Sequence, residues 1–209
     1  ARVPDDSGLH SAWWMIGTEA KSDKTAEVDI FEICGPDINT DQSRVRVSVH
    51  PWNDAGLSEQ SSDYYPACDV SQDFHVYGFE WQPEGMKFYF DGNLVKETSQ
   101  SPDYKMITFL GIYENDSPLW SGTPDYNSDY PKRFEIDYFR VYKTDEMLAW
   151  DAATDRNPVA GENLAPYAVV GAGQDWNWDS PPSNMIDNDA CSAFQSVDSP
   201  VFPQYLYLD

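Results

Sequence analysis

The stretch AEVDIFEIC (residues 26–34) decides the fold of this chain, because three acids interrupt what is otherwise a buried apolar strand. Strand alternation places Glu27 and Asp29 on one face and leaves Glu32 on the other. One extra residue, a β-bulge near Ile30 and Phe31, turns Glu32 back toward the first two acids. The stretch therefore predicts three carboxylates that converge on one face of a strand.

Two carboxyl groups close together suit glycoside hydrolysis, in which one attacks the anomeric carbon and the other protonates the leaving oxygen. We expect Asp29 to share a proton or hydrogen bond with its neighbours, so that Glu27 stays ionised while crowding keeps Glu32 protonated. The alternative is the solvated face of an edge strand, on which acids alternate with apolar residues without chemistry.

The segments around the three acids favour the catalytic interpretation. They read ARVP at residues 1–4, GLHSAWWMIG at 8–17, FHVYGFEWQPEGMKFYFDG at 74–92 and RFEIDYFRVYK at 133–143. In this order they resemble strands of glycoside hydrolase family 16, whose catalytic strand reads E-x-D-x-x-E in its bulged form. The resemblance covers residues 1–145, which we expect to form the catalytic domain.

The resemblance implies a mechanism and site residues. Glu27 becomes the nucleophile, Glu32 the general acid/base and Asp29 the auxiliary acid of a retaining endo-hydrolase, with no cofactor for catalysis. The two glutamate carboxyl groups should lie roughly 5 to 5.5 Å apart. The first substrate choice is β-1,3-glucan or mixed β-1,3/1,4-glucan. The alternatives are an endo-β-galactosidase acting on host or algal glycans, and a non-catalytic, lectin-like binder.

Substrate contacts are expected along the same face. His10 and Trp14 share a face of the strand at residues 9–17, and His10 stands where the family has a first tryptophan, which favours a different sugar preference. A core or surface role for His10 stays open. The full set of substrate-binding candidates is His10, Trp14, His50, Trp52, Tyr113, Glu114 and Trp120.

Composition agrees with a glycan partner. The 209 residues carry a formal net charge of −23, which repels nucleic acid and anionic membrane. Aromatic residues make up 15% of the chain and offer flat faces for sugar rings. No apolar run approaches the roughly 20 residues that span a bilayer. We expect a monomer without membrane insertion. Cys34 and Cys68 can pair or stay free, and the spacing of these two and Cys191 is not that of a metal site.

Short β-like runs separated by turn residues, with no lasting helical period, predict an all-β fold. The pattern and the resemblance together indicate a concanavalin-like jelly-roll β-sandwich whose concave sheet is the cleft. Besides residues 9–17 and 26–34, strands are expected at residues 44–49, 76–81, 86–90, 93–96, 106–113 and 134–142.

A domain boundary is expected at residues 146–162, where small, charged and turn residues indicate a linker. Residues 163–209 resemble part of a second β-sandwich, a discoidin-like carbohydrate-binding module of family 32. That resemblance implies a structural calcium at Asp187 and Asp189. The family 16 resemblance implies another at Asp137.

We expect an internal fragment of a secreted or cell-surface protein, because Ala1 lies inside a strand of the resemblance and the signal peptide would precede it. A jelly roll without its first strands exposes sheet edges and apolar surface. These 209 residues alone should therefore be poorly stable. A thermal melt followed by circular dichroism tests this, and a cooperative unfolding transition would contradict it.

Overall fold

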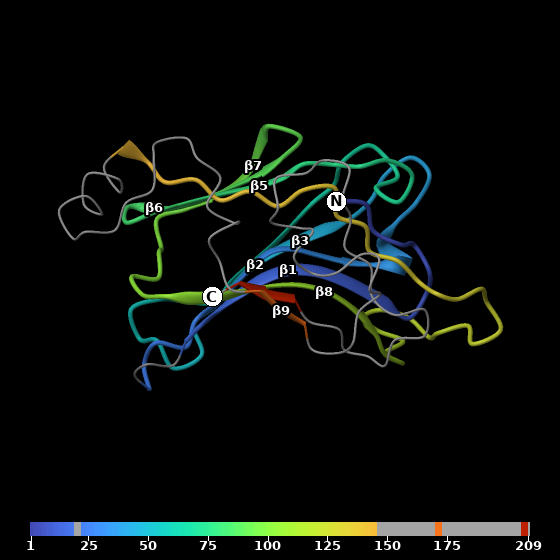
Figure 1. Ribbon diagram of the computed structural model, residues 1–209, viewed down its shortest axis with the longest axis horizontal. Coiled ribbons are helices and arrows are strands. Elements are labelled where there is room, and N and C mark those ends of the chain that lie inside the picture. Colours follow the sequence, from blue (N-terminus) through green and yellow to red (C-terminus); the bar gives the residue numbers. More distant parts are fainter. Residues whose placement is uncertain (19–21, 146–169, 173–205, 209) are drawn as a thin grey trace.

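The computed structural model describes residues 1–18, 22–145, 170–172 and 206–208, which fold into two antiparallel sheets. Figure 1 shows the two sheets as separate layers. The larger sheet has the order β4-β3-β2-β1-β8-β10-β9 and the smaller the order β5-β6-β7. The strands are β1 (Leu9–Gly17), β2 (Glu27–Cys34), β3 (Val45–His50), β4 (Gln60–Tyr64), β5 (Tyr77–Gln82), β6 (Gly85–Phe90), β7 (Asn93–Thr98), β8 (Met106–Glu114), β9 (Val170–Ala172) and β10 (Leu206–Leu208). The expected all-β sandwich is confirmed.

The bulge in β2 lies where the spacing of the acids predicts it. Opposite β1, Trp13 pairs with Phe31 and Trp14 with Asp29, so Ile30 has no partner. The register with β3 also shifts between Asp29 and Glu32. This extra residue restores the alternation for the rest of the strand.

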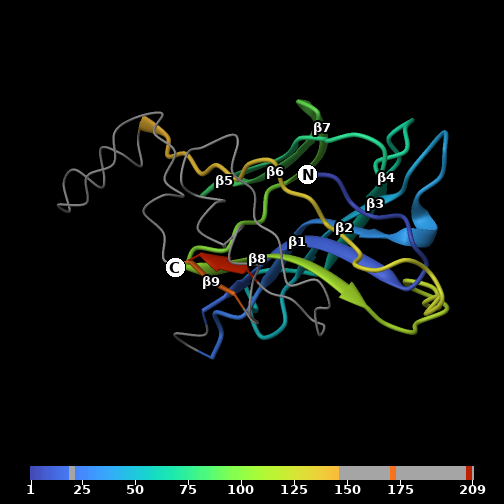
Figure 2. The ribbon, with the colours of Figure 1, turned by 45° about the vertical axis from the view of Figure 1, so that its right-hand side comes forward.

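The hydrophobic core lies between the two sheets, and β2 supplies its centre. Phe31 and Ile33 belong to one buried cluster, and Val28 and Ile30 to a second that includes Phe88 of the smaller sheet. The Phe31 ring also packs on the Tyr77 ring of β5, with centroids 4.2 Å apart. The apolar residues of β2 therefore join the two layers. Figure 2 shows β1, β2 and β8 curving side by side beneath the smaller sheet.

Two tight turns connect the strands of the smaller sheet at the residues where the sequence predicts them. Gln82 pairs with Gly85 across a two-residue turn that contains Pro83. Asp91 and Gly92 both have positive φ, 47° and 78°, which is the backbone that a type I′ turn requires. Two tight hairpins therefore place β5, β6 and β7 next to one another.

One expected strand is wrong, and one strand of the structure was not expected. Residues 134–142 form no strand, and Glu135 makes only an isolated bridge to Arg2. Of these residues only Phe139 is buried, while Tyr138 and Val141 are exposed, so the segment has no continuous core face. The polar strand β4 was not expected, because its sequence QSSDY carries no apolar alternation.

The two cysteines for which a disulfide was left open, Cys34 and Cys68, are both free thiols.

Of residues 146–209, the structure describes only β9 and β10, which extend the larger sheet beyond β8. The linker at 146–162 and the remainder of the module at 163–209 lie outside the described residues. Within the described part of the chain, no helix has the length and apolarity to cross a membrane.

Replacing Phe31 by Leu should destabilise the fold, because Phe31 is 1% exposed and joins the two sheets. We expect the free energy of unfolding to fall by about 1 to 3 kcal/mol. Urea denaturation followed by tryptophan fluorescence measures the change. Phe74→Leu is the matched control, because Phe74 is 49% exposed. Equal losses in both variants would contradict a core shared at Phe31.

Candidate active site

Three acids of β2 project from the face of the larger sheet that points away from the core. Val28, Ile30 and Phe31 of the same strand fill the core clusters, and the bulge keeps Glu32 on the side of Glu27 and Asp29. Asp29 is only 3% exposed, whereas Glu27 and Glu32 are half-buried. The structure thus brings the three predicted carboxylates to one face.

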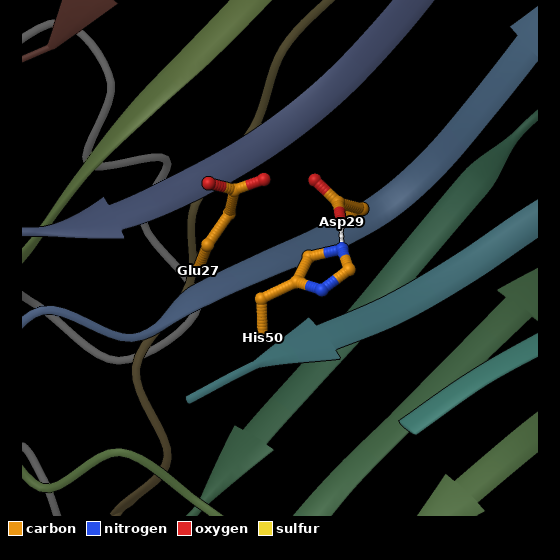
Figure 3. A group of neighbouring side chains, drawn as sticks. All are labelled: Glu27, Asp29 and His50. Atoms are coloured by element: carbon orange, nitrogen blue, oxygen red, sulfur yellow. Dashed lines mark ion pairs between the residues drawn. The ribbon is translucent and has the colours of Figure 1, made fainter. Parts of the chain in front are cut away.

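His50, at the end of β3, is the nearest basic group to Asp29. Its Nε2 lies 3.2 Å from Asp29 Oδ2, and its Nδ1 lies 2.7 Å from Glu59 Oε1. Figure 3 shows the imidazole beside Asp29, with the Glu27 side chain next to them. Asp29 and Glu59 raise the pKa of His50 to about 9 against the opposing effect of burial.

Burial shifts the titration of the acids themselves. Loss of hydration, against the opposing effect of His50 and together with the charges of Glu32 and Glu27, raises the pKa of Asp29 to about 7. Burial also raises the pKa of Glu27 above its ordinary value, against a hydrogen bond from Trp52 and the charge of His50. Asp29 and Glu27 therefore hold protons more tightly than ordinary carboxylic acids in water, and His50 limits that effect.

Trp52 reaches Glu27 from the loop after β3. Its indole Nε1 donates a hydrogen bond to Glu27 Oε2 at 3.2 Å, and its ring is 62% exposed. Its backbone has φ +48°, in the left-handed region that side chains other than glycine rarely adopt. The loop thus holds an accessible indole beside the carboxylate in a strained backbone conformation.

Glu32 lies among residues from β1, β3 and the loop after β8. His10 Nε2 is 3.2 Å from Glu32 Oε1, and Arg46 pairs opposite Glu32 in the sheet. Trp120 packs edge-on against the His10 ring at 5.6 Å, with the Arg46 guanidinium 4.3 Å from its centroid. His10 therefore contacts the site and is not a core residue.

The remaining predicted contacts belong to β1 and β8. Trp14 donates its indole hydrogen to Tyr113 Oη at 2.8 Å and stacks on Phe109 at 4.4 Å. Glu114 Oε2 accepts a hydrogen bond from Tyr130 at 2.6 Å. The Tyr113 ring lies 5.6 Å from the ring of His10. All seven substrate-binding candidates thus lie on β1, β3, β8 or the loops that follow them.

Of the metal-binding candidates, only Asp137 belongs to the described part of the chain, and it does not join this group. Asp137 is exposed and its charge acts on the Ala1 amino group. In the described part of the chain, no cluster of three Asp, Glu, His or Cys ligands includes it. The expected calcium at Asp137 therefore finds no such cluster, and Asp187 and Asp189 lie outside the described residues.

Sequence reasoning missed Glu59 and Arg46. Both reach the site through the cross-strand register, Arg46 opposite Glu32 and Glu59 just before the unexpected strand β4. The basic residue in VRVSVH was the one available signal for Arg46.

Several known proteins similar to this chain have names of glycan-cleaving enzymes. An endo-1,3-1,4-β-glycanase of Rhizobium meliloti is 28% identical over 145 residues, which are 69% of this chain and 29% of that protein. The GlcNAcα1-4Gal-releasing endo-β-galactosidase of Clostridium perfringens is 33% identical with a TM-score of 0.53, over 63% of this chain and 33% of that one. The endo-β-1,3-glucanase of Pyrococcus furiosus is 26% identical with a TM-score of 0.52, over 63% of this chain and 54% of that one.

The chain is shorter than the proteins that it resembles, since it spans 29% to 53% of the first curated relatives. A family model described as glycosyl hydrolases family 16 matches residues 1–140. That match covers well over half of the 209 residues and includes all three acids of β2, so the chain belongs to glycosyl hydrolases family 16.

Proposed function

We propose that the protein is a retaining endo-β-glycosidase that cleaves β-1,3-glucan or mixed β-1,3/1,4-glucan. The observation that carries this proposal is the bulge in β2, which gathers Glu27, Asp29 and Glu32 on one face of the larger sheet. Membership in family 16 and the similarity to glucan hydrolases support the reaction and the first substrate choice.

In the first step, the Glu27 carboxylate attacks the anomeric carbon while Glu32 donates its proton to the glycosidic oxygen. The bond between the anomeric carbon and the leaving sugar breaks, and an ester forms between Glu27 and the retained sugar. In the second step, Glu32 takes a proton from water as the water oxygen attacks the anomeric carbon. The ester breaks, Glu27 is again a carboxylate and Glu32 is again protonated.

The neighbours of the acids support these roles. Trp52 and His50 both lower the pKa of Glu27 against the effect of burial, so they favour the charged form that a nucleophile needs. Asp29, between the two glutamates in sequence, holds its proton more tightly than an ordinary aspartate. It can therefore share a proton or hydrogen bond with its neighbours, as an auxiliary acid does.

Aromatic side chains provide the sugar contacts in this proposal. The exposed Trp52 ring lies beside Glu27, and Trp120 lies beside His10 near Glu32. Flat apolar faces on both sides of the acids suit the C–H faces of successive sugar rings. A polymer bound across both tryptophans would be cut internally.

The second candidate is an endo-β-galactosidase, which two observations favour. His10 contacts Glu32, whereas the family resemblance places a tryptophan at this position. The endo-β-galactosidase of Clostridium perfringens is 33% identical to this chain, against 26% for the glucanase of Pyrococcus furiosus. A hydrogen-bonding imidazole selects for the position of a sugar hydroxyl more strictly than a second indole does.

The proposal also covers the location of the protein, its C-terminal region and its structural calcium. A polymeric substrate lies outside the cell, so we place the protein in the secreted or cell-surface class. Residues 163–209 resemble part of a carbohydrate-binding module after the linker, and within them β9 and β10 extend the larger sheet beside β8. A structural calcium in that module and at Asp137 belongs to the same proposal.

Replacing Glu27 by Gln should abolish hydrolysis, because the amide is neutral and cannot form the glycosyl ester. We expect at least a ~10³-fold loss of turnover, in line with the loss of other catalytic nucleophiles. Product analysis of the complete protein on laminarin, mixed-linkage glucan and a poly-N-acetyllactosamine glycan measures it and identifies the substrate.

Glu84→Gln makes the same chemical change in the exposed β5–β6 turn and should retain full activity. Internal cleavage of the lactosamine glycan alone would favour the galactosidase. Binding of a glycan without cleavage by the unmodified protein would instead favour a lectin-like function.

The pH profile should show a weakly acidic optimum, because activity requires Glu27 ionised and Glu32 protonated together. The imidazolium of His50 lowers the pKa of Glu27, so His50→Gln should raise that pKa and move the acid limb of kcat/KM to higher pH. Initial rates measured across the pH range test both. Maximal turnover above about pH 9, or an acid limb that moves to lower pH, would contradict the assignment.

A further inference from the structure

We propose that Glu27, Asp29 and His50 form a binding site for one zinc ion. Each residue offers one ligand atom, and these atoms all lie within 4.8 Å of one another. Two carboxylates and one imidazole are a donor set that zinc accepts in proteins, with a fourth position open to water. Figure 3 shows the three side chains directed toward one another from β2 and β3.

The orientation of His50 is the first observation behind this site. Its Nδ1 faces Glu59 Oε1 at 2.7 Å, so that nitrogen carries the proton. When His50 is neutral, its Nε2 carries a lone pair and faces Asp29 Oδ2, which is also an acceptor. Two acceptors at this distance need a cation between them. That cation is a proton in the imidazolium form of His50, or a metal ion that replaces the proton. A carboxylate on the far nitrogen of the imidazole is the arrangement that orients histidines for zinc.

The distance between the two donors is close to the distance that a zinc ion requires. Nε2 and Oδ2 are 3.2 Å apart. Two ligands that are each about 2.0 to 2.1 Å from zinc lie about 3.3 to 3.4 Å apart at a tetrahedral angle. These two donors therefore need only a small outward shift, and the ligand oxygen of Glu27 lies within 4.8 Å of both.

Asp29 supplies a second, independent observation. Its side chain is 4% exposed, and its buried Oδ2 makes no hydrogen bond of good geometry, because its contact with His50 Nε2 at 3.2 Å is an ion pair only. A buried carboxylate oxygen left without a well-formed hydrogen bond is costly, and a metal ion between the two atoms would satisfy it. Glu27 and His50 are only half-buried, so an ion can enter from the open face of the sheet.

The imidazole selects the metal. Calcium and magnesium prefer oxygen ligands, whereas imidazole nitrogen suits zinc. Zinc at this point would neutralise Glu27 and block its attack on the substrate. This inhibition rests on the proposed function, whereas the binding of zinc does not.

Calorimetric titration of the full chain with zinc chloride tests the site directly. We expect one zinc per chain, unaffected by excess calcium chloride, and binding at least about tenfold weaker in His50→Gln. His75→Gln is the matched control, because His75 faces Asp91 and Cys68 instead of the acids of β2. It should bind zinc as the unmodified protein does.

A second variant and a structural readout guard against misfolding. Glu59→Gln keeps every zinc ligand and should weaken zinc binding less than His50→Gln does, while circular dichroism shows that each variant is folded. Anomalous diffraction from a zinc-soaked crystal should locate the ion between Asp29 Oδ2 and His50 Nε2. No zinc binding, equal weakening in His75→Gln, or an ion located elsewhere would overturn the proposal and leave a proton between the two residues.

Activity measurements separate the two proposals. Loss of hydrolysis at the zinc concentrations that fill the site supports both. Zinc binding without loss of hydrolysis would support the site and contradict the nucleophilic role of Glu27. If the protein cleaves none of the glycans, the titration still decides the zinc site on its own.

Discussion

The bulge in β2 is the constraint on which both the core and the acidic face depend. A regular strand has a period of two, and three acids at positions 27, 29 and 32 cannot share one face of it. The extra residue Ile30 resolves the conflict, because the apolar side chains on both sides of it stay in the core. Removing the bulge would bury Glu32 and expose Ile33 at once.

Crowding three acids on one face is costly, and the neighbouring strands offset the cost. Two of the three histidines of the chain reach the acids, one from β1 and one from β3. Arg46 pairs opposite Glu32 in the sheet, although its guanidinium is shared with Asp63 of β4 at 3.2 Å. A protein of net charge −23 therefore concentrates part of its few basic groups at this face. The order β3-β2-β1 makes this compensation local, since both flanking strands contribute.

Local patterns in the sequence predicted much of this arrangement. The spacing of the acids predicted the bulge, and Asp91 with Gly92 predicted the tight hairpin, because both depend on a few adjacent residues. The polar strand β4 and the contact between Glu59 and His50 depend instead on which strands pair. No local period encodes that pairing. Residues 134–142 show the opposite case. Their apolar pattern predicted a strand, but the segment has no neighbouring strand to pair with and makes only one isolated bridge.

The left-handed backbone at Trp52 sets the stability of the loop against the hydrogen bond to Glu27. A residue with a side chain held at φ +48° costs the fold of order 1 to 3 kcal/mol, and glycine at the same position would remove most of that cost. Glycine would also remove the indole that donates to Glu27. Folding stability alone would therefore favour glycine at this position, whereas the hydrogen bond to Glu27 requires the tryptophan. The chain thus gives up backbone stability in this loop to hold an indole beside the acids of β2.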